Sequence, residues 1–211
     1  MVTWYNKFVK QIKFIYFDVG NVLNEYAASF DETTKKFSID PAKFMDFWME
    51  HEDDMTRGKM TADELWKKAI KRFQLLNAES HDFADSWVGS CTPQKKIHKI
   101  ISKLKKINKY KIGLLTNHYL GMVEKSIEKG KIPNHDYHAI ISSCSTGYQK
   151  PEKEIYMIAT EKARVKAEEI LFIDDLEENI EGAKKHGWQT VWFDMKNKDK
   201  AISEIEKILG V

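Results

Sequence analysis

The chain has 211 residues, of which 42% are apolar and 31% are charged, the proportions of a globular protein rather than of a disordered or fibrous one. Its formal net charge is only +2, which gives no sign of a nucleic-acid-binding protein. The apolar runs are too short to span a bilayer, and the N-terminus lacks the continuous apolar stretch of a signal peptide. Cys91 and Cys144 indicate neither a disulfide framework nor a metal-binding pair. We therefore expect a cytoplasmic protein with no membrane or nucleic-acid partner.

Short apolar runs that end in polar or small residues predict buried strands. In chain order these runs cover 13–19, 111–117, 138–143, 169–175 and 189–194, the third being the weakest. Helical patterns over 93–110, 151–165 and 176–188 alternate with them, and we expect Pro151 to begin the second helix and Gly187 to end the third. This alternation predicts βαβ units, hence an α/β fold with a Rossmann-like, three-layer core around a mostly parallel sheet.

The stretch 30–90 interrupts this rhythm because it contains no convincing strand. It is predicted to form several helices, over 40–55, 61–76 and 81–90, with Asp40 and Thr61 as N-caps. The sequence thus predicts a core made of 1–29 and 91–211 with a helical insert of 30–90. If the insert closes over a site, His51 or Arg57 could contact a substrate, although an ordinary charged helix end is the simpler interpretation.

Polar residues stand at the ends of three predicted strands: Asp18, then Thr116 and Asn117, then Asp174 and Asp175. Ligands of open α/β sheets bind beyond the carboxyl ends of the strands. Adjacent carboxylates at the end of a buried strand are unfavourable unless a cation neutralises them, and oxygen ligands suit Mg²⁺. A turn or a helix cap would explain any one of these residues, but their occurrence at three strand ends favours a binding site.

Four motifs in order resemble those of the haloacid dehalogenase-like superfamily, whose members are mostly phosphohydrolases. The stretch "FIYFDVGNVL" has Asp18 in the place of the nucleophile, and "IGLLTN" has Thr116 as the hydroxyl that binds the transferred phosphoryl group. The stretch "GYQKPEKEIY" supplies Lys150, and "FIDDLEENIEGAKKHGW" supplies the acidic pair Asp174 and Asp175. The resemblance identifies 30–90 as the small helical cap domain of this superfamily.

The resemblance implies a Mg²⁺-dependent phosphatase that acts on a small phosphorylated metabolite through an aspartyl-phosphate at Asp18. Mg²⁺ would be held by Asp18, Asp175 and the backbone carbonyl of Gly20, with Asp174 as a further or water-mediated partner. Thr116, Asn117 and Lys150 would bind the phosphoryl group, with Lys150 also offsetting the negative charges. The form "FDxGNV" is similar to a subset that includes sugar-1-phosphate phosphatases, so a sugar phosphate is one expected substrate.

Gly20 departs from the superfamily pattern, because most of its phosphatases carry a second aspartate there as general acid and base. The glycine keeps the carbonyl for the metal but removes a proton donor worth about 10²–10⁴-fold in rate. Two alternatives therefore stay open. One is a non-catalytic binding member of the superfamily. The other, less favoured, is a haloacid dehalogenase, since those enzymes typically carry Tyr-Gly-Thr where this chain has "GNV".

Overall fold

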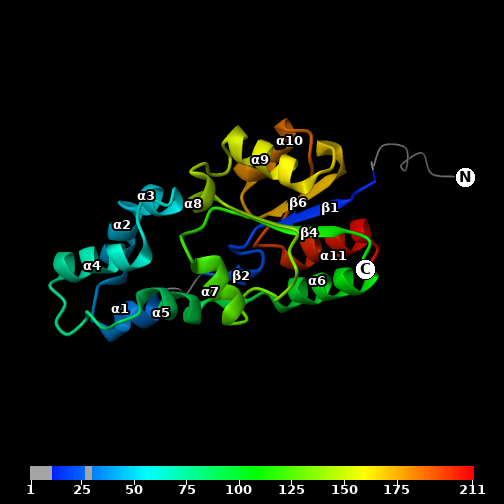
Figure 1. Cartoon of the computed structure of the whole chain (residues 1–211). Helices are drawn as coiled ribbons and strands as arrows, with labels where there is room; N and C mark the ends of the chain where they lie inside the picture. The colour runs from blue at the N-terminus through cyan, green and yellow to red at the C-terminus, as the bar shows by residue number, and fades with distance from the viewer. Residues whose placement is uncertain (1–10, 27–29) are drawn as a thin grey trace, which may run out of the picture.

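A five-stranded sheet lies at the centre of the computed structural model, which describes residues 11–26 and 30–211 (Figure 1). The strand order is β5-β4-β1-β6-β7, and each neighbouring pair is parallel. The strands are β1 (Phe14–Phe17), β4 (Lys111–Thr116), β5 (Ala139–Ser142), β6 (Ile170–Asp174) and β7 (Gln189–Trp192). All five predicted strands and the parallel α/β sheet are therefore confirmed.

Helices cover both faces of the sheet because side chains along a strand point alternately to opposite sides. Ile15 and Phe17 of β1 pack in one core with α6 (Lys95–Ile107) and α11 (Lys198–Leu209). Phe14 and Tyr16 pack in another core with α9 (Lys153–Ala163) and α10 (Glu177–Lys185). Figure 1 shows these helix pairs on opposite sides of the strands. This arrangement is the predicted three-layer core.

Two helices of the core begin two residues later than predicted. The helix predicted from residue 151 begins at Lys153, so Pro151 lies in the preceding loop. The backbone of Lys150, the residue before it, is hydrogen-bonded to the side chain of Asn117. The helix predicted from residue 93 begins at Lys95 because the preceding residues form a short strand. The helices and turns without a sequence prediction include α1 (Asp31–Lys36), α7 (Met122–Glu128), α8 (Ser143–Thr146), the 3-10 turn Ala167–Glu169, and α11.

The described part of the insertion contains five helices and lies between β2 (Asn24–Glu25) and β3 (Thr92–Pro93), which pair as an antiparallel ribbon. The predicted caps are confirmed, since the Asp40 carboxylate accepts two backbone N–H bonds and Thr61 forms a capping box. The helix predicted over 40–55 is wrong in one respect, because it divides at Glu50 and His51 into two helices. The helices are α1, α2 (Pro41–Met49), α3 (Glu52–Thr56), α4 (Ala62–Phe73) and α5 (Phe83–Ser90).

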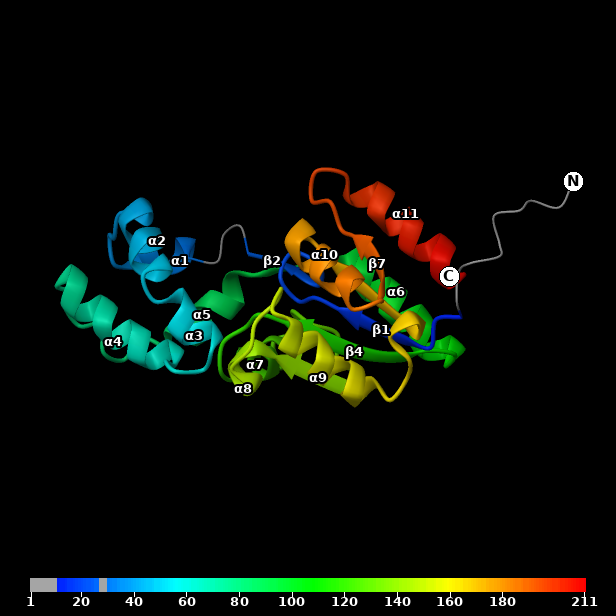
Figure 2. The same ribbon diagram turned by 90° about the horizontal axis from the view of Figure 1, so that it is seen from above.

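The insertion has a hydrophobic core of its own, rich in aromatic rings. Trp66 stacks on Phe83 with 5.3 Å between ring centroids, and Phe44 and Trp48 lie in the same cluster. Figures 1 and 2 both show the helices of the insertion beyond one end of the central sheet. No helix within the described residues is both long and apolar enough to cross a bilayer.

Candidate functional site

Three carboxylates meet at one edge of the sheet. Asp18 directly follows β1, Asp174 ends the adjacent strand β6, and Asp175 follows it. Each carboxylate offers an oxygen within 4.8 Å of the others. This proximity results from the parallel pairing, which places the carboxyl ends of neighbouring strands side by side. The structure thus brings together the acidic residues that the sequence placed at separate strand ends.

Lys150 is the cation of this cluster. Its Nζ lies 2.7 Å from Oδ1 of Asp18 and 2.6 Å from Oδ2 of Asp174. Burial alone would lower the pKa of Lys150, but the two carboxylates hold it above its ordinary value, so the side chain is charged. One ammonium group thus pairs with two of the three clustered carboxylates, and Asp175 has no ion-pair partner among the described residues.

The three aspartates differ in how the protein holds them. Asp174 is fully buried and accepts hydrogen bonds from the Leu176 amide, the Asn179 side chain and Lys150. Its oxygens are therefore occupied within the protein. Asp18 and Asp175 instead face an open cleft. This difference favours Asp18 and Asp175 over Asp174 as direct ligands of a cation.

The electrostatics of the open pair favour a divalent cation. Burial raises the pKa of Asp18 to about 7, Lys150 opposes this rise, and the other two carboxylates add to it. Burial likewise raises the pKa of Asp175. Carboxylate and carbonyl oxygens are preferred ligands of Mg²⁺. The Gly20 carbonyl accepts a hydrogen bond from the Val22 amide at 2.6 Å, which leaves its second lone pair for a ligand.

Asn21 supports Asp175 from the loop after β1, and nothing in the sequence assigned it a role. Its Nδ2 donates to Oδ2 of Asp175 at 2.9 Å. Asn21 has a φ of 54°, a left-handed conformation that asparagine tolerates better than most residues. The sequence signal for this role was an asparagine directly after a glycine, a pair that is typical of a tight turn.

The two polar residues that end β4 and follow it have different surroundings. Thr116 is buried at the end of β4. Asn117 lines the cleft, but its side chain also holds the loop after α8. Its Oδ1 accepts from the Lys150 amide at 2.8 Å, and its Nδ2 donates to the Lys150 carbonyl at 2.9 Å. Asn117 therefore positions Lys150, a task that the sequence prediction of phosphoryl binding did not include.

Tyr26 fills the space beside Gly20. A Cβ atom added to Gly20 would lie 2.8 Å from Cε2 of Tyr26, which is too close for a real contact. The Tyr26 hydroxyl lies 3.4 Å from Nε2 of His118, 92 positions away in the chain. Burial, and to a lesser extent Lys150, lowers the pKa of His118 to about 3, so its imidazole is neutral. The ring of Tyr26 thus lies where a side chain at position 20 would begin.

Gly20→Asp is expected to destabilise the protein by about 1–3 kcal/mol, because the new side chain must displace the Tyr26 ring from a packed site. It is not expected to raise activity on its own. In a Tyr26→Ala background the same substitution should cost much less stability, because the ring that it displaces is absent. Thermal unfolding and phosphate release measure both effects, with Gly20→Ala as the steric control. A Gly20→Asp variant as stable as the wild type would contradict this account.

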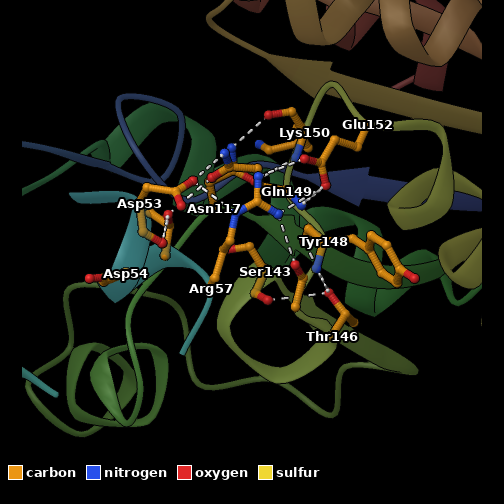
Figure 3. Close-up of polar contacts among 12 residues, drawn as sticks. Asp53, Asp54, Arg57, Asn117, Ser143, Thr146, Tyr148, Gln149, Lys150 and Glu152 are labelled. Atoms are coloured by element: carbon orange, nitrogen blue, oxygen red, sulfur yellow. Dashed lines mark hydrogen bonds and ion pairs between the residues drawn. The ribbon is translucent and has the colours of Figure 1, made fainter. Parts of the chain in front are cut away.

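Arg57 joins the insertion to the core. Its guanidinium donates to Oε1 of Glu152 at 2.7 Å, to the Gly147 carbonyl at 3.0 Å and to Asp53 at 2.8 Å (Figure 3). Gly147 and Glu152 flank the loop that carries Lys150. Arg57 is not among the described residues that line the cleft. It links the end of α3 to this loop by hydrogen bonds and an ion pair. The sequence had left open that Arg57 contacts a substrate, and this position does not favour that role.

A double-mutant cycle of Arg57→Ala and Glu152→Gln is expected to give a coupling of about 1 kcal/mol, because the pair is half-buried and charge-assisted. Urea unfolding of the four proteins measures it. The control cycle uses Lys59 and Asp54, which lie 3.9 Å apart and are both largely exposed. Equal coupling energies in the two cycles would show that the Arg57–Glu152 pair stabilises the protein no more than an exposed ion pair does.

A cleft of about 390 Å³ lies between the insertion and the carboxylates. Its floor contains Asp18, Lys150 and Asp175, and its walls are mainly apolar. Residues of the walls include Tyr26, Met49, Glu52, Trp87 and Tyr119 as well as Trp48, which also belongs to the core of the insertion. Nothing in the sequence marks these residues as part of a site, because only the folded chain brings them over the strand ends.

Solved structures of related proteins share this architecture. A haloacid dehalogenase (HAD) family enzyme from Bacteroides thetaiotaomicron is 25% identical, with a TM-score of 0.71 over 87% of this chain and 94% of that one. A mutant of that enzyme was crystallised with magnesium and inorganic phosphate. An L-2-haloacid dehalogenase, 17% identical, shares the fold with a TM-score of 0.67 over 86% of this chain and 84% of that one.

Sequence comparison agrees. A bifunctional epoxide hydrolase from Sus scrofa is 26% identical over 103 residues, which are 46% of this chain but only 18% of that relative. Residues 19–193 match the family described as haloacid dehalogenase-like hydrolase. That match covers most of the chain and contains Thr116, Lys150 and the acidic pair. The chain belongs to the haloacid dehalogenase-like hydrolases.

Proposed function

We propose that the protein is a Mg²⁺-dependent phosphohydrolase that cleaves a small phosphorylated metabolite through an aspartyl-phosphate on Asp18. The observation that carries this proposal is the pairing of Asp18 and Asp175 at the floor of the cleft, with Lys150 bound to Asp18. In this proposal residues 30–90 act as a cap over the core formed by 1–29 and 91–211. The related Bacteroides enzyme with magnesium and phosphate supports it.

Each residue has a defined task in this reaction. Asp18 would attack the phosphorus, which divides the displacement into two easier steps. Lys150 would keep Asp18 ionised and bind a phosphoryl oxygen, and the Thr116 hydroxyl would hold another. Asp18, Asp175 and the Gly20 carbonyl would hold Mg²⁺, with Asp174 keeping Lys150 in place. Bound Mg²⁺ would offset the negative charge that otherwise repels the nucleophile from the phosphate.

The leaving group receives no proton from position 20, because glycine has no acidic side chain. Substrates with a good leaving group depend least on this missing step. We therefore expect acyl and aryl phosphates to react faster than simple alkyl phosphates. Loss of a general acid costs about 10²–10⁴-fold, and the difference between these substrate classes should fall in that range.

Removal of the metal provides the first test. EDTA is expected to abolish hydrolysis of an aryl phosphate, and Mg²⁺ to restore it. Asp175→Asn is expected to weaken the apparent affinity for Mg²⁺ by at least about tenfold, because it removes a charged ligand. The control is Asp54→Asn, which changes an exposed aspartate outside the cleft.

The alternatives make different predictions in the same assay. A non-catalytic binding member would bind Mg²⁺ without turning over any phosphate ester. A haloacid dehalogenase would release chloride from a 2-haloacid in the presence of EDTA. Either result would replace the proposal. Phosphoryl transfer requires that the negative charge of the phosphoryl group be offset. Lys150, and a cation held by Asp175, would offset it, which supports the phosphatase.

A further inference from the structure

The walls of the cleft differ in character from its charged floor. Trp48, Trp87 and Tyr119 form a triangle in which ring centroids lie 5.1–5.5 Å apart. The ring of Tyr26 lies 5.6 Å from that of Trp87 and extends this surface toward Gly20. A substrate whose phosphate reaches Asp18 must therefore place its leaving group against aromatic side chains.

The only charged side chain that the described part of the insertion contributes to the cleft is Glu52. Burial raises the pKa of this carboxyl group, which is half-buried beside Tyr119. The insertion offers no lysine or arginine to the cleft within the described residues. A second anionic group on the substrate would thus meet a carboxylate and find no partner in these walls.

Trp87 adds a polar feature. Its indole N–H is buried and has no hydrogen-bond acceptor among the described residues, although Trp87 lines the cleft. An unsatisfied buried donor is unfavourable, so such a group is usually satisfied by a ligand or a water molecule.

From these features we infer that the substrate is a phosphate monoester of a hydrophobic, uncharged alcohol, with an aromatic or branched apolar group packed against Trp48 and Trp87. This inference rests on the proposed phosphatase function and names its substrate class. It differs from the sugar phosphate that the sequence suggested, because a sugar would bring many hydroxyl groups to the walls that the insertion contributes, where the described residues offer few polar side chains. Unmatched polar groups in such a site lower binding.

Phosphate release from four compounds, measured with Mg²⁺, tests the phosphatase function and the substrate class separately. Acetyl phosphate reports the chemistry alone. Phenethyl phosphate, a carboxyphenethyl phosphate and a hexose phosphate differ in the leaving group. We expect kcat/KM for phenethyl phosphate to exceed that of each of the other two esters by about tenfold or more. Hydrolysis of all three esters at equal rates would overturn the inference and leave the phosphatase function intact.

Substitutions in the walls of the cleft provide a second test of the substrate class. Met49→Lys adds a cation to the cleft, and Glu52→Gln removes the anion. Each is expected to raise the ratio of kcat/KM for carboxyphenethyl over phenethyl phosphate by about fivefold to tenfold. Met157→Lys is the matched control, because Met49 and Met157 are both 58% exposed and only Met49 lines the cleft. Ratios that do not change in either cleft variant would overturn the inference.

Binding of non-hydrolysable analogues tests the substrate class without turnover. Calorimetry with the Mg²⁺-loaded wild type should give a smaller Kd for phenethylphosphonate than for its carboxylated analogue or a hexose phosphonate. This preference with no hydrolysis of any ester would overturn the phosphatase function and keep the ligand class. Equal or undetectable binding of all three would overturn the ligand class.

Discussion

Asp18→Asn is expected to lower kcat for phosphate release by more than about 10³-fold, because it removes the proposed nucleophile while keeping the shape of the side chain. The fold should persist, since asparagine can still accept a hydrogen bond from Lys150. The measurement is Mg²⁺-dependent hydrolysis of an aryl phosphate by the two proteins, with circular dichroism as the check on folding.

Asp54→Asn is a suitable control for that experiment, because Asp54 is an exposed aspartate outside the described lining of the cleft. It is expected to leave the rate within about threefold of the wild type. Equal rates for Asp18→Asn and the wild type would contradict attack by Asp18. A variant that is inactive because it has unfolded is recognised from its circular dichroism spectrum.

Lys150→Met is expected to lower the free energy of unfolding by roughly 3–5 kcal/mol, because it leaves buried carboxylates without their cation. Lys150 binds both Asp18 and Asp174 within 2.7 Å. Urea unfolding in EDTA measures the loss. Mg²⁺ is expected to restore part of the stability, since a metal at Asp18 and Asp175 would offset the same charge.

The double variant Lys150→Met with Asp174→Asn isolates the cause of that loss. If the loss comes from an uncompensated carboxylate, removal of the Asp174 charge should recover part of it. If it comes from poor packing of the new methionine, the second substitution should add a further loss. A decrease below about 1 kcal/mol for Lys150→Met alone would show that the ion pairs contribute little to stability.

The core of the fold could be predicted because its strands are short apolar runs with clear ends. "KFIYFDV" and "EILFIDD" have their apolar residues buried on both faces of the sheet, so each reads as a nearly continuous apolar run. Their terminal aspartates come together because parallel neighbouring strands end at the same edge. The acidic residues of the site could therefore be found from their positions at strand ends.

The walls of the cleft could not be predicted, because their geometry depends on how distant segments pack. Tyr26 approaches Gly20 and His118 only in the folded chain, and local sequence gives no sign of either contact. Trp48 is buried in the hydrophobic core of the insertion. That it also lines the cleft depends on how α2 lies over the strand ends.

The contacts that hold the loop around Lys150 could not be predicted either, because their partners are far apart in the sequence. Arg57 lies 95 positions before Glu152, and many charged side chains in this lysine-rich and acid-rich chain could have served as its partner. Asn117 has a side-chain amide that could bind phosphate or backbone equally well. The Asn117 side chain pairs with the Lys150 backbone, in the turn after α8, only in the folded chain.

The central claim is that Asp18 becomes phosphorylated during turnover. The most direct test is to quench the reaction of the Mg²⁺-loaded protein with acid during hydrolysis of acetyl phosphate and to analyse its peptides by mass spectrometry. Borohydride reduction of a trapped acyl phosphate should then convert residue 18 to homoserine. This account predicts a phosphate on the peptide that contains Asp18, and homoserine at that position. Rapid hydrolysis with an unmodified Asp18 at every quench time would contradict it.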